Sequence, residues 1–514
     1  MYQIFAVNSS KQTLYENIGV ARIKTFLEKK GIETEITYLY QSEGVENELK
    51  KVNFNNKYFG FSFLYCYSDF IFELCSRIKE IRKDSVIFLG GRSVTDAYVQ
   101  IHEDCPDFDV SVLGHGENPT YYCITELEKG RTLDEVVSQY PHLASRKFQN
   151  NKSECYEDIN NLELPDRGYT HKNLTTASIC TSHGCVGHCT FCSWKATGAK
   201  WCGRPMKSVF DEIVSIYESC GIRDFTFNDG SFEDPGTLGK KRIHELCGYL
   251  EQYPVKFAFR FYLRAESFKE EPEDIALLKR MRKNGFITAF VGIESGCNED
   301  LKTYSKRATI EDNLRVFKLL KEADIDMLYG FIMMNPYSTR ETLRANYDFL
   351  KNNQCHHLFS YVNVLDVFYN TAIYDRVKAD NLLLPTYRYN KTSAYKNFNS
   401  DTEEIKAFLV KNFNDETQIM RNYWEFYNFI NYFHFIKVIH SDIYKTNAFA
   451  VDEMVDRLSV LLDNYFETLY VNHDIKACQE KYEEFIGEVN EVYYKIRKMK
   501  LHILKQVQKS IIAL

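Results

Sequence analysis

Three closely spaced cysteines are the residues of this 514-residue chain that are best suited to chemistry. Cys185, Cys189 and Cys192 lie within eight residues, directly after an apolar run that predicts a strand. Thiolates are soft ligands that favour zinc or an iron–sulfur cluster, and iron–sulfur sites are normally built from such short spacings. Three ligands leave a coordination position open, which is typical of a reactive centre because structural sites are usually closed by four protein ligands. The spacing therefore predicts a compact, reactive metal centre.

A structural zinc site is the alternative interpretation of the same loop. Its fourth ligand would be His183, His188, Cys180 or Cys202. Most of the 15 cysteines stand singly in hydrophobic segments, which favours reduced, buried thiols over a disulfide framework. The position of the cysteine loop in a series of β/α units favours the reactive centre over zinc.

Length, composition and charge exclude several classes of protein. A chain of 514 residues with 44% hydrophobic and 26% charged residues predicts a globular protein of two or three domains. The net charge of -7 argues against a nucleic-acid partner. No apolar run approaches the roughly 18 residues of a membrane span, and the chain enters a strand without a basic leader. We therefore expect a cytoplasmic protein with no membrane span.

The first 135 residues alternate strand-like and helix-like runs, which is typical of a doubly wound, Rossmann-like parallel sheet. Gly90 and Gly91 follow one of its predicted strands, and Gly114, Gly116 and Glu117 follow the next. Such sheets bind ligands at the carboxyl ends of their strands, so these loops predict a cofactor crevice. The alternative is that the glycines only turn the chain.

A linker is expected at 136–170, where the sequence is polar and irregular. Residues 171–384 then contain repeated strand-like runs separated by helical stretches, which predicts a partial or complete β/α barrel with its chemistry in the loops after the strands. Residues 385–514 change to long helical periods and predict a helical C-terminal domain, in which the aromatic residues from Tyr423 to Phe429 form core. The expected barrel strands are Ala177–Cys180, Phe225–Asn228, Lys256–Tyr262, Ile287–Ile293, Met327–Met333 and Tyr361–Val367.

The cysteine loop, Cys185-x-x-x-Cys189-x-Phe191-Cys192, resembles the signature of the radical S-adenosylmethionine (radical SAM) superfamily. The resemblance continues through Gly292-Ile-Glu-Ser-Gly296 and the other expected strand ends, and it implies a partial (β/α)6 barrel. It further implies a [4Fe-4S] cluster on the three cysteines, with S-adenosylmethionine (SAM) on the open iron. An electron from a reductant such as flavodoxin or ferredoxin would then cleave SAM to methionine and a 5'-deoxyadenosyl radical.

The resemblance also implies cofactor-binding roles beside Phe191 of the signature. Asp229 would lie near the amino group of SAM, Glu294 and Ser295 near its ribose or methionine portion, and Arg264 near its carboxylate. A zwitterionic sulfonium ligand needs such acceptors and such a cation. The alternative is that Glu294 or Arg264 forms an ordinary ion pair.

The N-terminal domain resembles the cobalamin-binding domain of one radical SAM subfamily, chiefly in Phe88-Leu-Gly-Gly91 and in Val112-Leu-Gly-His-Gly-Glu-Asn-Pro-Thr120. The order of domains is also the same. No Asp-x-His-x-x-Gly motif follows the first strand, so no lower axial histidine is assigned. Asn335-Pro336 stands where the family often has Gly-x-Pro, and Tyr369-Asn-Thr371 where it often has Pro-Gly-Thr.

The leading hypothesis is a cobalamin-dependent radical C-methyltransferase with one cluster, acting on a peptide or a small natural product. The alternative is a radical peptide epimerase or rearrangement enzyme without cobalamin, in which Cys355 or Cys202 returns a hydrogen atom to the substrate. Either thiol is otherwise an ordinary cysteine. A non-catalytic metal-binding scaffold is a third possibility, but it would give an open three-cysteine site no purpose.

Overall fold

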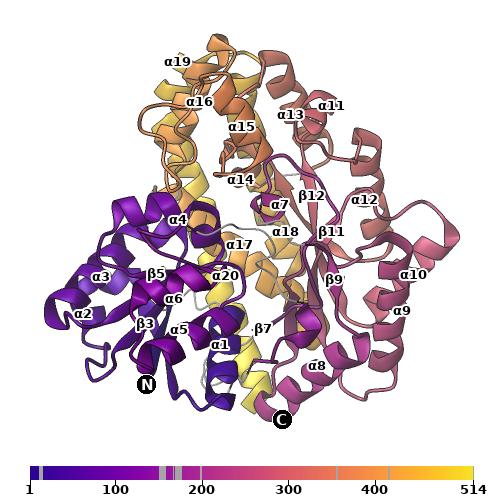
Figure 1. The fold of residues 1–514 in the computed structure, drawn as a ribbon. Coiled ribbons are helices and arrows are strands. Elements are labelled where there is room, and N and C mark those ends of the chain that lie inside the picture. The colour runs from indigo at the N-terminus through magenta and orange to yellow at the C-terminus, as the bar shows by residue number, and fades with distance from the viewer. Residues whose placement is uncertain are drawn as a thin grey trace.

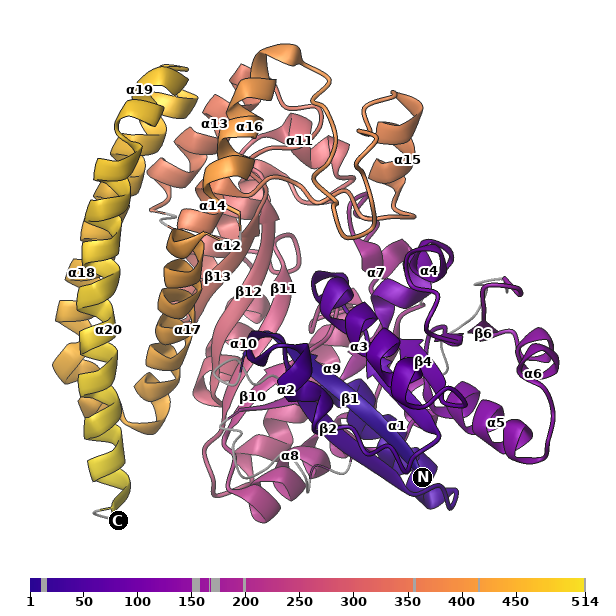
Figure 2. The same cartoon turned by 90° about the vertical axis from the view of Figure 1, so that its left-hand side faces the viewer.

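The computed structural model describes residues 1–10, 16–149, 158–165, 167, 176–196, 200–354, 357–414 and 417–512. An N-terminal α/β unit lies beside a central α/β unit, and long C-terminal helices run along the central sheet (Figures 1 and 2). Among the described residues, no helix combines the length and the apolar character that crossing a membrane requires.

The N-terminal unit is a six-stranded sheet in the order β2-β1-β3-β4-β5-β6, parallel except for the last pair. Its strands are β1 (Tyr2–Asn8), β2 (Thr34–Tyr40), β3 (Tyr58–Ser62), β4 (Val86–Gly90), β5 (Val110–Val112) and β6 (Leu143–Ala144). Its helices are α1 (Ile18–Lys29), α2 (Val45–Leu49), α3 (Ser68–Ile81), α4 (Arg92–Asp104), α5 (Glu117–Glu128) and α6 (Leu133–Gln139).

This sheet confirms the expected doubly wound fold. Every residue of β1 is buried, as is usual for a parallel strand covered on both faces. The strand order reverses between β1 and β3, and ligands bind at such a switch point in open α/β sheets. Strand β6 comes from within the segment that we expected to be a linker, and it closes the far edge beside β5.

The central unit is a five-stranded parallel sheet in the order β13-β12-β11-β10-β7. Its strands are β7 (Thr176–Ile179), β10 (Asp224–Phe227), β11 (Ala258–Arg264), β12 (Phe286–Glu294) and β13 (Asp326–Phe331), and a small hairpin is formed by β8 (Ser182–His183) and β9 (Cys202–Gly203). The helices are α7 (Ser193–Ala196), α8 (Met206–Cys220), α9 (Gly236–Glu251), α10 (Pro272–Lys283), α11 (Asn298–Thr303), α12 (Ile310–Glu322), α13 (Arg340–Asn352), α14 (Leu358–Val362) and α15 (Ala372–Ala379).

The two faces of the central sheet differ in character. On β11, Phe259, Phe261 and Leu263 are buried in the core, whereas Arg260 and Tyr262 point to the opposite face. Tyr262 keeps 38% of its surface exposed although its strand is central in the sheet. The inner face is therefore not filled by its own side chains.

The prediction of a sixth barrel strand at Tyr361–Val367 is wrong. Leu358–Val362 forms helix α14, and the only strand-like pairing of the segment is a single parallel bridge between Met334 and Val364 in the described chain. A short apolar run does not distinguish a strand from a buried helix by periodicity. A helix is favoured over a strand here because it lets the Tyr361 hydroxyl donate a hydrogen bond of 2.6 Å to Asp463 of α18 (Ser441–Tyr470).

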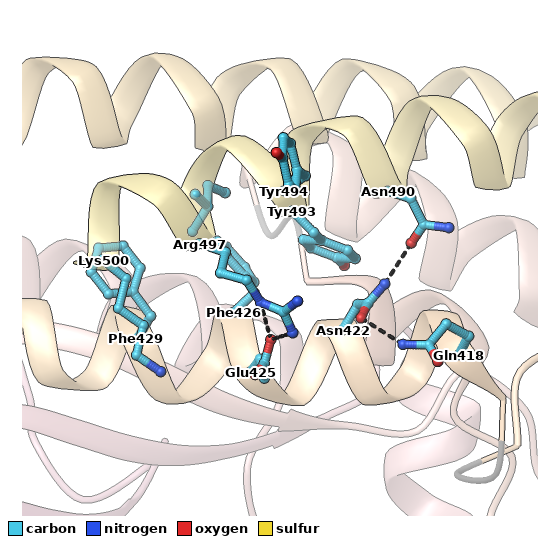
Figure 3. Close-up of a pocket in the computed structure, with 11 residues that line it drawn as sticks. Gln418, Asn422, Glu425, Phe426, Phe429, Asn490, Tyr493, Tyr494, Arg497 and Lys500 are labelled. Atoms are coloured by element: carbon cyan, nitrogen blue, oxygen red, sulfur yellow. Dashed lines mark hydrogen bonds and ion pairs between the residues drawn. The ribbon is translucent and has the colours of Figure 1, made fainter. Parts of the chain in front are cut away.

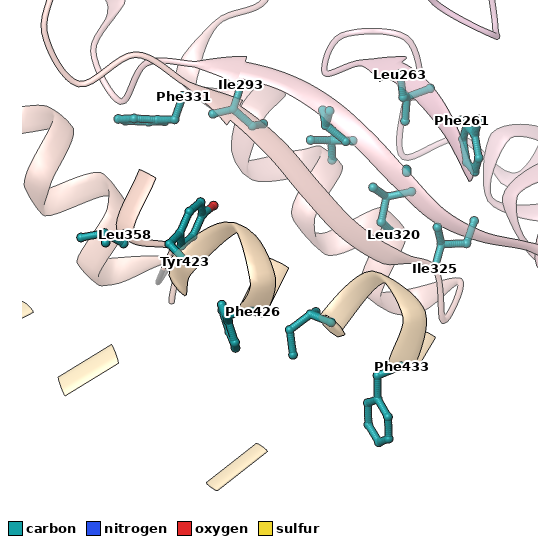
Figure 4. Packing of buried hydrophobic residues seen from close by; sticks show 14 of the residues in the cluster. Phe261, Leu263, Ile293, Leu320, Ile325, Phe331, Leu358, Tyr423, Phe426 and Phe433 are labelled. Carbon is teal, nitrogen blue, oxygen red and sulfur yellow. The ribbon is translucent and has the colours of Figure 1, made fainter. Parts of the chain in front are cut away.

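The C-terminal unit is helical, as expected, with α16 (Glu403–Asn412), α17 (Gln418–Ile439), α18 (Ser441–Tyr470), α19 (Ile475–Glu480) and α20 (Tyr482–Ile512). Its aromatic residues are core: Tyr423, Phe426 and Phe433 of α17 belong to the same buried cluster as Phe261 and Phe331 of the sheet (Figure 4). Polar contacts join α17 to α20, where Asn422 donates to Asn490 at 2.7 Å and Arg497 pairs with Glu425 (Figure 3). Helix α17 thus lies between the sheet and the outer helices (Figure 2).

A buried ion network joins the N-terminal unit to the barrel. Arg167 pairs with Glu16 and with Glu212 of α8, and Arg204 also pairs with Glu212. All four side chains are at most 5% exposed. The backbone N–H of Ser178 in β7 donates to Glu16 at 2.8 Å, so the network fixes the strand that leads into the cysteine loop.

Replacing Arg167 with alanine should lower the free energy of unfolding by about 3–5 kcal/mol, because two buried carboxylates would lose their partner. Urea unfolding followed by tryptophan fluorescence measures this difference. The matched control is Arg457→Ala, which breaks an exposed pair with Glu491 and should cost about 0–1 kcal/mol. Equal costs for the two variants would contradict the structural role of the network.

Candidate functional site

The cysteine loop begins at the β8–β9 hairpin, where His183 is paired with Cys202. Gly184 follows with φ of 76°, and a Cβ there would lie 2.5 Å from the Lys200 carbonyl oxygen. Only glycine fits this conformation and this close approach. Gly230 makes room on the other side, since its Cβ would lie 3.0 Å from that of Cys185.

The three thiols lie close enough for their charges to interact. Burial raises the pKa of Cys185, and it raises the pKa of Cys189 to about 11. The neighbouring Cys192 raises both values further, whereas Lys306 acts against the rise at Cys189. In the described part of the chain, no three His, Cys, Asp or Glu side chains gather around one point as they would for a single metal ion. Three interacting soft ligands on one loop fit a cluster, whose positive charge would favour the thiolate forms.

Two of the residues considered as a fourth zinc ligand, His183 and Cys202, have other contacts. The ring of His183 packs against His115 at 4.9 Å and against Trp194 at 5.5 Å between centroids. The Cys202 thiol lies 3.0 Å from an Asp158 oxygen, just before the short turn η3 (Ile159–Asn161). Burial raises the pKa of Cys180 to about 11. None of these observations favours a closed zinc site.

Asp229, directly after β10, holds the start of the cysteine loop. Its carboxylate accepts hydrogen bonds from the backbone N–H groups of Thr181 and Ser182, at 2.8 and 2.6 Å, and from both hydroxyls, at 2.9 and 3.0 Å. Burial raises the pKa of Asp229 to about 6, and these hydrogen bonds oppose the rise. The structure thus gives Asp229 a positioning role, and its contact with the amino group of SAM stays a prediction.

Arg264, the last residue of β11, lies among carboxylates beside the loop. Its Nη2 is 2.7 Å from Asp234, its Nε is 3.4 Å from Glu233, and Asp234 accepts a hydrogen bond from the Val186 N–H at 3.3 Å. Arg264 thus forms ion pairs, and its contact with the SAM carboxylate stays a prediction. Its Nη1 makes no hydrogen bond with the described residues but lies 3.7 Å from a carboxylate oxygen of Glu266.

Glu294 ends β12 with a positive φ of 64°, and its side chain folds back over two glycines. A Cβ on Gly292 or on Gly330 would lie 2.7 or 3.1 Å from its carboxylate oxygens. Lys306 lies 3.6 Å from the same carboxylate and donates to the Gly292 carbonyl at 3.0 Å. Glu294 therefore also forms an ion pair, beside the lysine that acts on Cys189.

Ser295 lies in a buried polar network rather than in an open site. Its hydroxyl donates to Asn346 at 2.8 Å, Asn346 donates to Asp300 at 2.9 Å, and Asn335 donates to Asp300 at 2.7 Å and to Tyr304 at 2.9 Å. Sequence reasoning missed this network. Its one signal was Asn335, noted only as a departure from the usual family residue.

Phe191 connects this network to the cysteine loop. Its ring packs edge to face on Tyr304 at 5.3 Å. The adjacent Thr190 donates through its N–H to the Tyr304 carbonyl and through its hydroxyl to that of Thr303. The end of α11 therefore holds the loop on the side away from Asp229.

The glycine loops of the N-terminal unit form one cavity of about 140 Å³. Gly90, Gly91, Gly114, Gly116 and Glu117 all line it. Other parts of its wall come from β1, from α1 and from the carboxyl ends of β3 and β5. The predicted crevice is thus present at the switch point of the sheet, while the cofactor contacts of these five residues stay a prediction.

The crevice lies directly against the cysteine loop. Arg92, after Gly91, stacks on Trp194 at 3.8 Å and donates to Ser193, next to Cys192. His115, between the other two glycines, packs on His183. Burial lowers the pKa of His115 to about 3 and that of His183 to about 4, so both rings are neutral near pH 7 and pack without repulsion.

Of the two cysteines considered as hydrogen donors, the structure describes one. Cys202 lies in β9, with its thiol beside Asp158, and burial raises its pKa. Cys355 lies outside the described residues.

Known proteins resemble this chain in sequence over the part that contains the cysteine loop. Residues 179–350 match the radical SAM superfamily. An uncharacterised methyltransferase of Pyrococcus horikoshii is 24% identical over 387 residues, which are 73% of this chain and 78% of that protein. The matches to several other curated relatives span less than half of those proteins' own length.

Two solved structures share the architecture. The cobalamin-dependent S-adenosylmethionine radical enzyme OxsB, with aqua-cobalamin and SAM bound, superposes with a TM-score of 0.68 at 17% identity, over 99% of this chain and 80% of that one. The radical SAM methyltransferase TsrM of Kitasatospora setae, with tryptophan and a SAM analogue, gives 0.56 at 19% identity, over 69% of this chain and 71% of that one. These likenesses confirm the expected fold class.

Replacing Asp229 with alanine should reduce the iron bound after anaerobic reconstitution at least about fivefold, because each buried donor left without a partner costs about 1–3 kcal/mol. Iron analysis and the visible absorbance of the cluster measure this. Asp211→Ala removes an exposed carboxylate that pairs only with Lys207 and should keep full iron content. Normal iron in the Asp229 variant would refute the positioning role.

Proposed function

Because the chain carries a radical SAM domain, we propose that it is a cobalamin-dependent radical SAM enzyme that methylates an unactivated carbon of a peptide or small natural product. The observation that carries this proposal is the contact between the crevice of the N-terminal unit and the cysteine loop. Arg92 and His115 flank the crevice, and both contact residues of the loop region.

That arrangement suits an enzyme with two cofactors. When bound, a [4Fe-4S] cluster with SAM supplies a 5'-deoxyadenosyl radical, and cobalamin supplies a methyl carrier. Cys185, Cys189 and Cys192 would hold the cluster, and the Arg264 Nη1 and the Glu294 carboxylate offer a donor and acceptors to SAM. A methyl carrier and a radical must reach the same substrate carbon, so their sites have to adjoin.

The crevice has a lining that suits part of a large cofactor. Tyr2, Phe88 and Val112 supply apolar walls, and Asn17 and Thr120 supply polar groups. A volume of about 140 Å³ admits one substituent of a corrinoid rather than the whole ring. The similar structures of OxsB and TsrM contain bound cobalamin, which supports the same assignment here.

The radical epimerase stays the alternative reaction. It would need a thiol that gives a hydrogen atom to the substrate, and the Cys202 thiol is engaged with Asp158 instead. This contact argues against Cys202 as the donor, while Cys355, the other candidate, lies outside the described residues.

The reconstituted enzyme with dithionite and SAM should release 5'-deoxyadenosine, and methylcobalamin should bind and change its absorption spectrum. Chromatography of deoxyadenosine and S-adenosylhomocysteine, with and without cobalamin, measures both. Cys189→Ala should abolish cleavage, whereas Cys220→Ala, at a thiol on the outer helix α8, should not. Deoxyadenosine without any cobalamin binding would reject the methyltransferase and favour the epimerase.

Replacing Gly19 with phenylalanine should weaken cobalamin binding at least about tenfold, since Gly19 lines the crevice and only the Asn17 side chain lies within 4 Å of its added Cβ. Equilibrium titration followed by absorbance measures the affinity. Gly487→Phe, at an open position of helix α20, is the matched control and should bind normally. Unchanged affinity in the Gly19 variant would place cobalamin elsewhere.

A further inference from the structure

A second, larger cavity lies on the inner face of the central sheet. Its volume is about 420 Å³, within the usual range for small-molecule sites. It is lined by residues of all five strands of this sheet and by residues 427–432 of α17. We call it the barrel chamber. Its lining includes Thr176, Asp224, Thr226, Arg260, Tyr262, Thr288, Phe290, Leu328, Tyr427, Asn428, Asn431 and Tyr432.

Several polar atoms of the barrel chamber lack a partner. Asp224 Oδ1, Arg260 Nε, Thr288 Oγ1 and Asn431 Oδ1 are buried and make no hydrogen bond with the described residues. Asp224 is 3% exposed and Thr288 is 1% exposed. Buried polar groups are almost always paired in folded proteins, so four such atoms around one cavity indicate that something else satisfies them.

The charges of the barrel chamber cancel. Arg260 forms an ion pair with Asp224, which also accepts a hydrogen bond from Thr176 at 2.8 Å. Asp326, at the start of β13, lies 3.5 Å from Lys437 and 3.9 Å from His434 of α17. No charged lining group is left for a strongly ionic ligand in the described structure. The four atoms without a partner are two acceptors, one donor and one hydroxyl. They suit a neutral ligand that both donates and accepts hydrogen bonds.

Aromatic rings form the walls between these polar groups. Tyr262 and Phe290 come from the sheet, with centroids 5.3 Å apart, and Tyr427 and Tyr432 come from α17. Aromatic side chains bind the flat faces of ligand rings, and neighbouring amide and hydroxyl groups form hydrogen bonds with the substituents of those rings. A hydrocarbon chain would leave the orphaned polar atoms unsatisfied.

The barrel chamber adjoins the predicted SAM site along the strands. Tyr262 lies two residues before Arg264, and Phe290 lies two residues before Gly292, against which the Glu294 carboxylate packs. Residues two apart on a strand share a face and are about 7 Å apart. The Tyr262 and Phe290 end of the chamber is therefore one side-chain layer away from the carboxyl ends of β11 and β12, and Arg260 and Thr288 lie two residues further toward the amino ends.

From these observations we infer that the barrel chamber is the substrate site, and that it selects a neutral ring compound rich in hydroxyl and amide groups, such as a sugar or nucleoside moiety. This inference rests on the proposed function and narrows its substrate class. It excludes hydrocarbon substrates and large macrocycles. It also makes Asn431 and its neighbours on α17 determinants of specificity, although α17 belongs to the C-terminal helices.

Saturation-transfer NMR on the reconstituted, SAM-loaded protein tests the inference with three probes: uridine, N-acetylglucosamine and 1-octanol. Saturating SAM keeps the probes out of the cofactor site. Uridine or N-acetylglucosamine should bind, and binding should weaken about tenfold in a variant with both Thr288→Val and Asn431→Leu, which loses two hydrogen-bonding side chains. The matched control carries Thr446→Val and Asn464→Leu on exposed positions of α18 and should bind as the unchanged protein does.

Circular dichroism and iron content establish that both variants are folded and loaded. Binding of 1-octanol alone, no binding of either polar probe, or equal binding in the two double variants would overturn the inference. Deoxyadenosine formation and cobalamin titration on the same preparations report separately on the proposed function. Probe binding without deoxyadenosine would reject that function while the chamber remained a ligand site.

Discussion

The buried carboxylate of Asp229 is the point on which the site depends. It accepts hydrogen bonds from the backbone and the hydroxyls of Thr181 and Ser182, and so fixes the direction in which the chain leaves β7 toward Cys185. Burial raises the pKa of this carboxyl to about 6, and the hydrogen bonds act against that rise. Burial therefore disfavours the ionised form of Asp229, and the hydrogen bonds from the start of the cysteine loop offset part of that cost.

The rest of the architecture supports this loop from three directions. The Arg167 network fixes the start of β7 against the N-terminal unit. Thr190 and Phe191 attach the loop to the end of α11. Arg92 and His115 approach from the glycine loops of the first sheet. Each contact joins residues far apart in sequence, so the three cysteines are positioned by the tertiary fold rather than by their own spacing.

The difference between local spacing and tertiary contacts explains how much could be predicted from sequence. The ligands, the strands and the glycine loops could be predicted, since they depend on local spacing and periodicity. Local periodicity failed at Tyr361, where an apolar run was assigned to a strand and is instead a helix that packs on α18. It also gave no account of Asn335. Its amide bridges Asp300 and Tyr304 in a buried network, and such partners are visible only in three dimensions.

The two faces of the central sheet differ in how much they contribute to stability. The outer face carries Phe259, Phe261 and Leu263 and packs against helices, which fixes the sheet. The inner face carries Arg260, Tyr262 and Thr288, of which two leave buried polar atoms without partners. A protein selected for stability alone would fill this space with apolar side chains, since each unpaired group costs about 1–3 kcal/mol. Unsatisfied groups that gather around one cavity are the expected mark of a surface kept for a ligand. If this surface is the substrate site, substrate choice would depend on α17, a C-terminal helix whose sequence carries none of the motifs of the barrel.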